Sequence, residues 1–481
     1  GNINYLKTDG AKLPIQKDRL SASEPTVSMA PGNSDLALEK TDIFLKAAYG
    51  NLSLKGQYLI NHRSAYIGNA SALTDNNLIT YTDFWNELIY NQPITENLSS
   101  KLRLYFDQFE QHVQVELFPP GFRTSATNVF PNGMIGAPSL KDRTLGAELQ
   151  FDYEPFDGNH LMIGANYENI TQFDVTESTN FNPLTNAYLG SIQDITSWGN
   201  FNKDVKRDVT AGYLQDEWAI RENLNATAGA RFDHYSDFGS SLNPRAGLVW
   251  GFMKDAELKL LYGQAFRAPS FVELYNANNP TVLGNSKLQP ETVDTYEADA
   301  GYRFATAYRI SIDYFYSKIQ DLITRDTAVS PAMYENIGSA DVSGIETELT
   351  GNYSGANYWK LSYTYQIPKN AATGQNLDSV PSHRVTAQVN YEITKYVNSH
   401  VDVLWTGSRP RAAGDNRDTV PSYTTVDLTL VGQKFVKNLE IALMIHNLFD
   451  EKYVDPDSSG LVPTDFPRAG RDIRIGATYK F

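Results

Sequence analysis

The connections between strand-like segments alternate between short and long along almost the whole of this 481-residue chain. About nineteen segments carry the β-branched and aromatic residues and the two-residue alternation of strands. In an up-and-down barrel every second connection lies at the same rim, so the alternation places the long loops at one end. A soluble sandwich or propeller has no reason to sort its loops in this way. The pattern therefore predicts an all-β, antiparallel up-and-down barrel.

The predicted strands are, by number, 38–49, 52–60, 79–90, 98–117, 143–153, 161–175, 209–220, 224–235, 243–252, 258–266, 293–304, 308–323, 342–353, 358–367, 384–393, 401–406, 423–432, 439–448 and 472–481. The predicted long loops are 61–77, 118–142, 176–206, 267–292, 324–340, 368–383 and 450–470. Residues 2–6 are expected to end a further strand, and 8–36 to form another outer loop. A barrel that began there would expose an unpaired strand edge, so we expect N-terminal strands of the natural protein to precede this sequence.

The composition restricts how such a chain could enter a membrane. The mean hydropathy is −0.40, and no apolar run approaches the ~18 to 20 residues of a membrane helix. A membrane protein of this composition can only be a barrel. The chain has no cysteine, which excludes disulfides, thiolate metal sites and cysteine nucleophiles. Its net charge of −15 argues against a nucleic-acid partner.

The last strand shows the alternation most clearly. One face carries Ile473, Ile475, Ala477, Tyr479 and Phe481, and the other carries Asp472, Arg474, Gly476, Thr478 and Lys480. A final strand that ends on an aromatic residue is typical of bacterial outer-membrane barrels, so we assign an assembly signal to Tyr479 and Phe481. This segment alone would also fit a soluble sandwich. By the same alternation we predict that Tyr302, Tyr316, Val389, Trp405 and Tyr479 face lipid, and that Glu297, Arg303, Glu346 and Arg384 face the lumen.

Several motifs identify a family resemblance. They are Ala265-Phe266-Arg267-Ala268-Pro269-Ser270-Phe271-Val272-Glu273-Leu274-Tyr275, then Leu283-Gly284-Asn285, Leu288-Gln289-Pro290-Glu291-Thr292, Val342-Ser343-Gly344-Ile345-Glu346, Asn447-Leu448-Phe449-Asp450-Glu451-Lys452-Tyr453 and the terminal Tyr479-Lys480-Phe481. Their order and spacing resemble those of the TonB-dependent outer-membrane receptors over essentially the whole chain, as barrel only. The resemblance implies a barrel of about 22 strands. About 19–20 of them lie in residues 1–481, while the first strands, the N-terminal plug and the energy-coupling box are absent from this sequence.

The resemblance also implies a function. We expect active transport of a scarce nutrient, most simply a ferric siderophore, across the bacterial outer membrane. The expected partners are a TonB-type coupling protein, a metal chelate or similar nutrient, and outer-membrane lipid with lipopolysaccharide. A monomer without a cofactor is expected. The alternatives are a cobalamin or other nutrient receptor of the same family, a passive porin, or an outer-membrane enzyme. Enzyme motifs such as Gly-x-Ser-x-Gly, His-Glu-x-x-His and the P-loop are absent.

Residues of the outer loops are the candidates for ligand contact. Haem receptors of this family carry a histidine between the Phe-Arg-Ala-Pro box and an Asn-Pro-Asn-Leu box, but no histidine separates Phe266 from Glu291 here. The seven histidines are too scattered for a metal site. We expect loop 267–292 to help close the mouth as a mobile lid. Its motif residues are Phe266, Arg267, Ala268, Pro269, Leu288, Pro290 and Glu291, and the aromatic and arginine candidates are Phe118, Phe122, Arg123, Phe130, Trp198, Arg267, Tyr275, Tyr334, Arg409 and Arg411.

Overall fold

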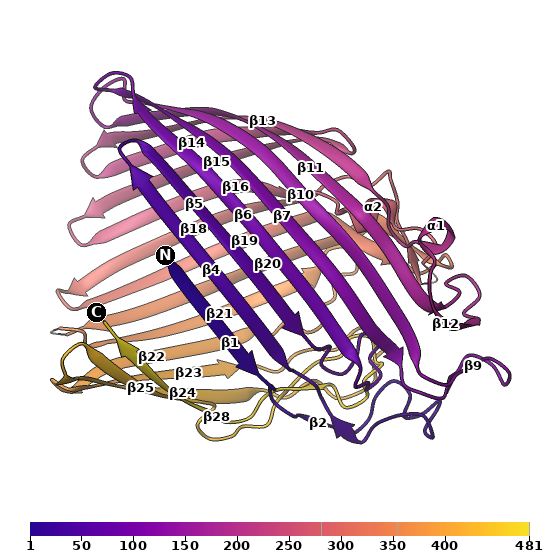
Figure 1. The fold of residues 1–481 in the computed structure, drawn as a ribbon. Helices are drawn as coiled ribbons and strands as arrows, with labels where there is room; N and C mark the ends of the chain where they lie inside the picture. The colour runs from indigo at the N-terminus through magenta and orange to yellow at the C-terminus, as the bar shows by residue number, and fades with distance from the viewer. Residues whose placement is uncertain (280, 354, 481) are drawn as a thin grey trace.

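One curved antiparallel sheet accounts for most of the computed structural model, which describes residues 1–279, 281–353 and 355–480 (Figure 1). In this described part the sheet has 22 strands, two of which, β12 and β17, are short pieces of the outer loops. The predicted assembly residue Phe481 lies outside the described residues. None of the described helices is long and apolar enough to cross a membrane.

The barrel strands follow one another in chain order. They are β1 (Asn2–Thr8), β4 (Leu38–Tyr49), β5 (Leu52–Arg63), β6 (Asn77–Pro93), β7 (Leu98–Phe118), β10 (Met134–Tyr153), β11 (Asn159–Phe181), β13 (Val205–Arg221), β14 (Leu224–Tyr235), β15 (Gly239–Met253), β16 (Ala256–Arg267), β18 (Glu291–Ala305), β19 (Tyr308–Asp326), β20 (Ala332–Asn352), β21 (Tyr358–Asn370), β22 (His383–Thr394), β23 (Val397–Thr406), β24 (Tyr423–Val436), β25 (Leu439–His446) and β28 (Asp472–Tyr479). The loops carry β2 (Pro14–Ile15), β3 (Gly32–Asn33), β8 (Phe122–Arg123), β9 (Val129–Phe130), β12 (Tyr188–Asp194), α1 (Thr196–Gly199), α2 (Phe271–Tyr275), β17 (Val282–Leu283), β26 (Val454–Asp455) and β27 (Phe466–Pro467).

Each of the nineteen predicted strands is present, and β1 supplies the further strand expected near residues 2–6. Strand β1 pairs with β4 and β28 pairs with β25, so β1 and β28 are the two end strands of the described sheet. The predicted loops at 118–142, 176–206 and 324–340 are partly wrong. Strands β10, β11, β19 and β20 continue well into these segments, because their ladders stay hydrogen-bonded beyond the length that a membrane requires. Between β19 and β20 only residues 327–331 remain outside strands.

The register joins the predicted faces across neighbouring strands. One row runs Asp299, Asp313, Glu346, Thr364, Arg384 and Thr406 through six strands, whereas the adjacent row runs Ala300, Ile312, Thr347, Tyr363, Val385 and Trp405. Since residues directly opposite each other share a face, the polar and apolar sets remain separate around the sheet.

The polar face is the concave one. Tyr105 of β7 donates to Glu168 of β11 across the intervening β10, and Tyr213 of β13 reaches Glu148 of β10 across β11 at 2.9 Å. Arg309 spans β18 in the same way to contact Glu257 at 2.9 Å. Side chains of second-neighbour strands meet only where a sheet curves toward them. The polar face therefore lines the lumen, and the apolar face, with exposed residues such as Val389, Tyr302 and Tyr479, is the outer one.

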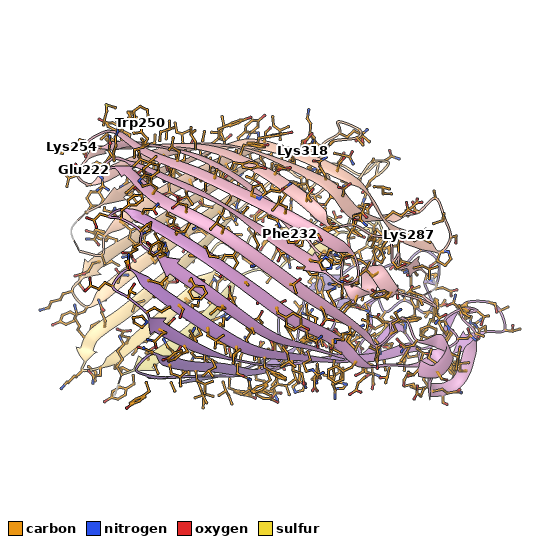
Figure 2. The ribbon with its side chains drawn as sticks, turned by 90° about the horizontal axis from the view of Figure 1, so that it is seen from above. Glu222, Phe232, Trp250, Lys254, Lys287 and Lys318 are labelled. Atoms are coloured by element: carbon orange, nitrogen blue, oxygen red, sulfur yellow. The ribbon has the colours of Figure 1, made fainter. Side chains whose placement is uncertain are left out.

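Loop length separates the two rims of the barrel. The short turns lie at one end, and the long loops with α1, α2, β2, β9 and β12 lie at the other (Figure 1). Figure 2 shows Glu222, Trp250 and Lys254 at the short-turn end and Lys287 at the loop end. At the loop end Ile15, Ile67, Leu73 and Val462 form a buried cluster that joins N-terminal and C-terminal loops. Tyr66 donates to the carbonyl of Pro467 at 2.6 Å, and burial raises the pKa of Tyr66 to about 12.

Candidate functional site

Arg267 is a clamp at the base of loop 268–290. Its guanidinium donates two hydrogen bonds to Glu291, at 2.6 and 2.7 Å, and two to Glu273, at 2.9 and 3.0 Å. These bonds raise the pKa of Arg267. Although burial alone would raise it, the bonds from Arg267 and Ser270 hold the pKa of the Glu273 carboxyl below its ordinary value. Both ends of the loop are thus tied to one charged group.

The sequence folds locally to present Glu273 to this arginine. Pro269 ends the extended strand, and Ser270 then caps α2 in a capping box with Glu273. The box fixes the first turn, so that the Glu273 carboxylate points back toward Arg267. Leu274 of the same helix is buried.

Arg207 anchors the same segment from β13, and the sequence analysis missed it. Its side chain is only 8% exposed and pairs with Asp237 at 2.8 Å. It also donates to the carbonyl of Pro269 at 2.9 Å and lies 4.6 Å from the ring centre of Phe271. Tyr235 and Phe238 flank it as further aromatic contacts. A single arginine near the start of a strand gives no indication in the sequence that three aromatic side chains will surround it.

The tip of loop 268–290 is held by its neighbours. The backbone N–H of Ala277 donates to the carbonyl of Phe201 at 2.8 Å, and the side chain of Asn278 donates to Asn200 at 3.0 Å. Strand β17 pairs in parallel with the start of β20. The side chain of Asn285 donates to the backbone carbonyl of Tyr334 at 3.0 Å. The loop therefore joins the 182–204 loop on one side to the β19–β20 hairpin on the other.

Three of the predicted aromatic residues meet in a second cluster. Phe118 and Phe122 stack with ring centres 4.0 Å apart, and Phe122 lies 6.2 Å from Phe130. Phe130 is fully buried and contacts Tyr188 edge-on at 5.3 Å. Met134 and Phe181 complete this core. Its packing fixes the β8–β9 hairpin against the 182–204 loop, so Phe130 has a packing role in this structure.

Arg409 and Arg411 belong to an ionic network between loops 407–422 and 447–471. Arg411 makes a two-bond contact with Asp465 at 2.8 and 2.9 Å, and Arg417 joins Asp465 to Asp415. Hydrogen bonds from Arg417 lower the pKa of Asp415 to about 2. Arg409 is 5% exposed and pairs with Asp455 at 3.0 Å. These arginines therefore already form ion pairs with carboxylates of the loops.

The remaining predicted contacts lie at separate places. Trp198 on α1 is 46% exposed, and Arg123 is exposed without an ion pair among the described residues. Lys203 lies 4.4 Å from the ring centre of Tyr275, and Arg325 lies 6.0 Å from that of Tyr334. The structure thus groups the ten candidates into three anchoring clusters and a few exposed groups, rather than one pocket.

Histidines take no part in the outer loops. All seven lie in strands, and His62, His112, His234 and His383 contact hydroxyl groups of Thr80, Ser139, Ser240 and Tyr363. Over the described ranges we find no group of three or more acidic or histidine side chains arranged to hold a metal ion.

Comparisons with known proteins match this architecture. A family described as "TonB dependent receptor-like, beta-barrel" matches residues 31–448. The "Iron-regulated outer membrane virulence protein" of Vibrio cholerae serotype O1 is 28% identical over 266 residues, covering 50% of this chain and 41% of that protein. The "Hemin receptor" of Yersinia pestis is 24% identical over 306 residues, covering 56% and 44%. The chain thus spans less than half the length of these relatives.

The fold is shared with solved receptors. A mutant of the ferric enterobactin receptor of Pseudomonas aeruginosa, in complex with enterobactin, aligns over 100% of this chain and 76% of that chain. The TM-score is 0.76 at 17% sequence identity, which establishes the common fold. One relative is thus an iron-regulated protein of the outer membrane, and the other relative and the solved neighbour are receptors for hemin and for ferric enterobactin.

Proposed function

The chain belongs to the TonB-dependent receptor family of outer-membrane barrels, and we propose that it is the barrel of an energy-dependent importer of a ferric siderophore. The proposal includes an N-terminal plug and coupling box, a TonB-type partner, and a monomeric barrel. The observation that carries it is the outer mouth, where the Arg267 clamp and the Phe118–Phe122 stack hold long loops in place at one rim of the barrel.

Among the iron ligands of the relatives, a siderophore fits this chain better than haem does. One relative is named a hemin receptor and one structural neighbour was solved with enterobactin. Axial ligation of haem iron by an outer loop calls for a side chain such as histidine. Loop 268–290 has no histidine, and neither do the segments 182–204 and 447–471. All three segments carry aromatic side chains, and 447–471 also carries Arg468 and Arg471. Such groups suit an anionic aromatic chelate.

Removing the tip of loop 268–290 tests the proposal directly. The backbone N–H of Gly284 donates to the carbonyl of Asn276 at 2.8 Å, so these two residues already lie side by side. After excision of residues 277–283, Asn276 can therefore be joined to Gly284 without moving the clamp at Arg267. We expect weaker uptake of the radiolabelled ferric siderophore and an unchanged, heat-modifiable barrel. Replacing the exposed Lys287 with Gln serves as a control, with uptake expected to stay at the parental level.

Energy dependence separates the proposal from its alternatives. The assay uses the full-length receptor in a strain that lacks other iron receptors, grown under iron limitation with each siderophore in turn. Uptake should stop when the membrane potential is collapsed. Uptake that persists would identify a passive pore. Growth on haem, but on no siderophore, would reassign the ligand.

A further inference from the structure

The outer, lipid-facing surface shows where the membrane ends. On three strands an aromatic residue at the short-turn end and the next charged residue on the same face are separated by ten positions: Tyr153 and Arg143, Phe304 and Asp294, Tyr308 and Lys318. Ten residues of a strand tilted by about 45° rise roughly 23 Å, which is close to the ~25 Å height of the apolar band. These three charges therefore lie at the outer interface, at the level of the lipid headgroups.

Tyrosines mark the same level. Tyr167 donates to Asp208 at 2.8 Å, Tyr262 to Asp294 at 2.9 Å and Tyr316 to Asp341 at 3.1 Å. Tyrosine prefers this position because its ring remains in the apolar layer while its hydroxyl reaches polar groups. Each of these bonds joins adjacent strands on the convex face, unlike the second-neighbour contacts inside the lumen.

Arg143 differs from the other interfacial charges. The residues directly opposite it are Gln108 on β7 and Thr171 on β11, both neutral. Its guanidinium lies 5.4 Å from the ring centre of Phe173, and its Nε is buried without a hydrogen-bond partner. It makes no ion pair within the described chain. The side chain is partly exposed, and the ring holds the guanidinium in place without neutralising its charge.

A second cation lies in the same row. Lys206 on β13 is directly opposite Thr171, so Arg143, Thr171 and Lys206 occupy one level on three neighbouring strands. The Lys206 side chain is 60% exposed, and its ammonium is only loosely paired, at 3.6 Å from Asp208. Lys141, two positions further out, is already paired with Asp174 at 3.2 Å and lies 4.0 Å from Glu110. Arg143 and Lys206 are therefore the two cations of this row that remain available for an external anion.

The contrast with Lys318 shows that such a row is not a general property of the rim. Lys318 lies between Asp294 on β18 and Asp341 on β20, each directly opposite it (Figure 2 labels Lys318). Its two acidic neighbours offset its charge. Arg143 has no such neighbours in its row.

We propose that Arg143 and Lys206 bind a phosphate group of the outer-leaflet glycolipid, with Thr171 between them. Two cations on strands separated by one other strand lie about 10 Å apart, and both long side chains can converge on a phosphate above Thr171. The apolar band directly below accommodates acyl chains of the same lipid. The site lies on the outside of the barrel, so it is independent of the siderophore and of the lumen.

Native mass spectrometry tests the site on receptor extracted from outer membranes, delipidated and titrated with bis-phosphorylated lipid A. Near an anionic surface each basic residue contributes about 1 kcal/mol, which is about a 5-fold change in affinity. Arg143→Gln should weaken binding about 5-fold, and the double change with Lys206→Gln about 25-fold. Arg143→Lys should stay within about 2-fold of the parent because the charge remains. Lys318→Gln is the matched control and should leave binding unchanged.

Different lipids identify the group that is recognised. Dephosphorylated lipid A should bind weakly to the parent and equally to all variants. Phosphatidylglycerol should bind less tightly than lipid A, because it offers one diester phosphate. Equal losses in Lys318→Gln and Arg143→Gln would overturn the site, as would an unchanged double variant. If phosphatidylglycerol showed the same affinity and the same losses, the assignment to the glycolipid would be wrong.

Discussion

Placing an arginine on the lipid-facing side of β22 should destabilise the barrel far more than placing one on the neighbouring lumen position. Val389 is 46% exposed and lies near the middle of the twelve-residue strand, opposite Trp359 and Val401 on the apolar face. Arg at the midplane costs roughly 2–4 kcal/mol, which corresponds to a decrease of about 30- to 900-fold in the folding equilibrium constant. Val389→Arg should therefore lower the free energy of unfolding by that amount.

The adjacent lumen position provides the matched comparison. Gln388 donates to Asp402 at 2.8 Å and lies opposite Lys360, whose ammonium is already paired with Glu348. An arginine at 388 can keep a bond to Asp402 in a wet environment, so Gln388→Arg should cost less than about 1 kcal/mol. Urea unfolding of each variant in lipid vesicles, followed by tryptophan fluorescence, measures both values. Equal losses at 388 and 389 would refute the assignment of the two faces.

Three further predictions concern the loops. Arg267→Gln leaves Glu273 and Glu291 without their clamp, so deuterium uptake in 268–290 should rise, whereas Lys287→Gln should not change it; equal uptake in both variants would count against the clamp. Glu177 is 1% exposed, and burial raises its pKa to about 8. Between the ordinary pKa of a glutamate and pH 8, Glu177 therefore keeps its proton while the 182–204 loop is folded and releases it when the loop opens. The stability of this loop should fall as pH rises through that window. Glu177→Gln should remove that pH dependence from the exchange protection of 182–204, and a persistent dependence would point to another group. Tyr66→Phe removes the bond to Pro467 and should cost about 1 kcal/mol in local opening of the 447–471 loop, measured by exchange; unchanged protection would show that the bond carries no net stability.

The strands and their faces could be predicted from the sequence because both depend on neighbouring residues. Alternation with a period of two assigns Tyr302 or Glu346 to a face without knowledge of any partner strand. Loop parity needs only the order of short and long connections. The prediction starts β10 and β20 too late and ends β11 and β19 too early, since polar residues continue in strands whenever a neighbouring strand satisfies their backbone groups.

The anchors of the loops could not be predicted in this way, because their partners are distant in sequence. Arg411 and Asp465 are 54 positions apart, and Arg207 contacts Pro269 across 62 positions. The sequence alone does not distinguish a loop arginine that binds a ligand from one that is paired with a carboxylate. The arginines at 267, 409 and 411 were predicted as ligand contacts, and each is committed to acidic side chains in the structure. Their direct contact with a ligand stays a prediction.

The same anchors restrict how the mouth can move. Loop 268–290 is fixed at its base by Arg267, on its inner side by Arg207, and at its tip by Phe201 and the start of β20. A lid that moved alone would have to break all of these contacts, several of which join charged groups. Movement together with the 182–204 loop and the β19–β20 hairpin would keep the contacts at the tip and strain only the base. Closure over a ligand should therefore involve these three segments as one unit, hinged where Pro269 and Pro290 join the barrel strands.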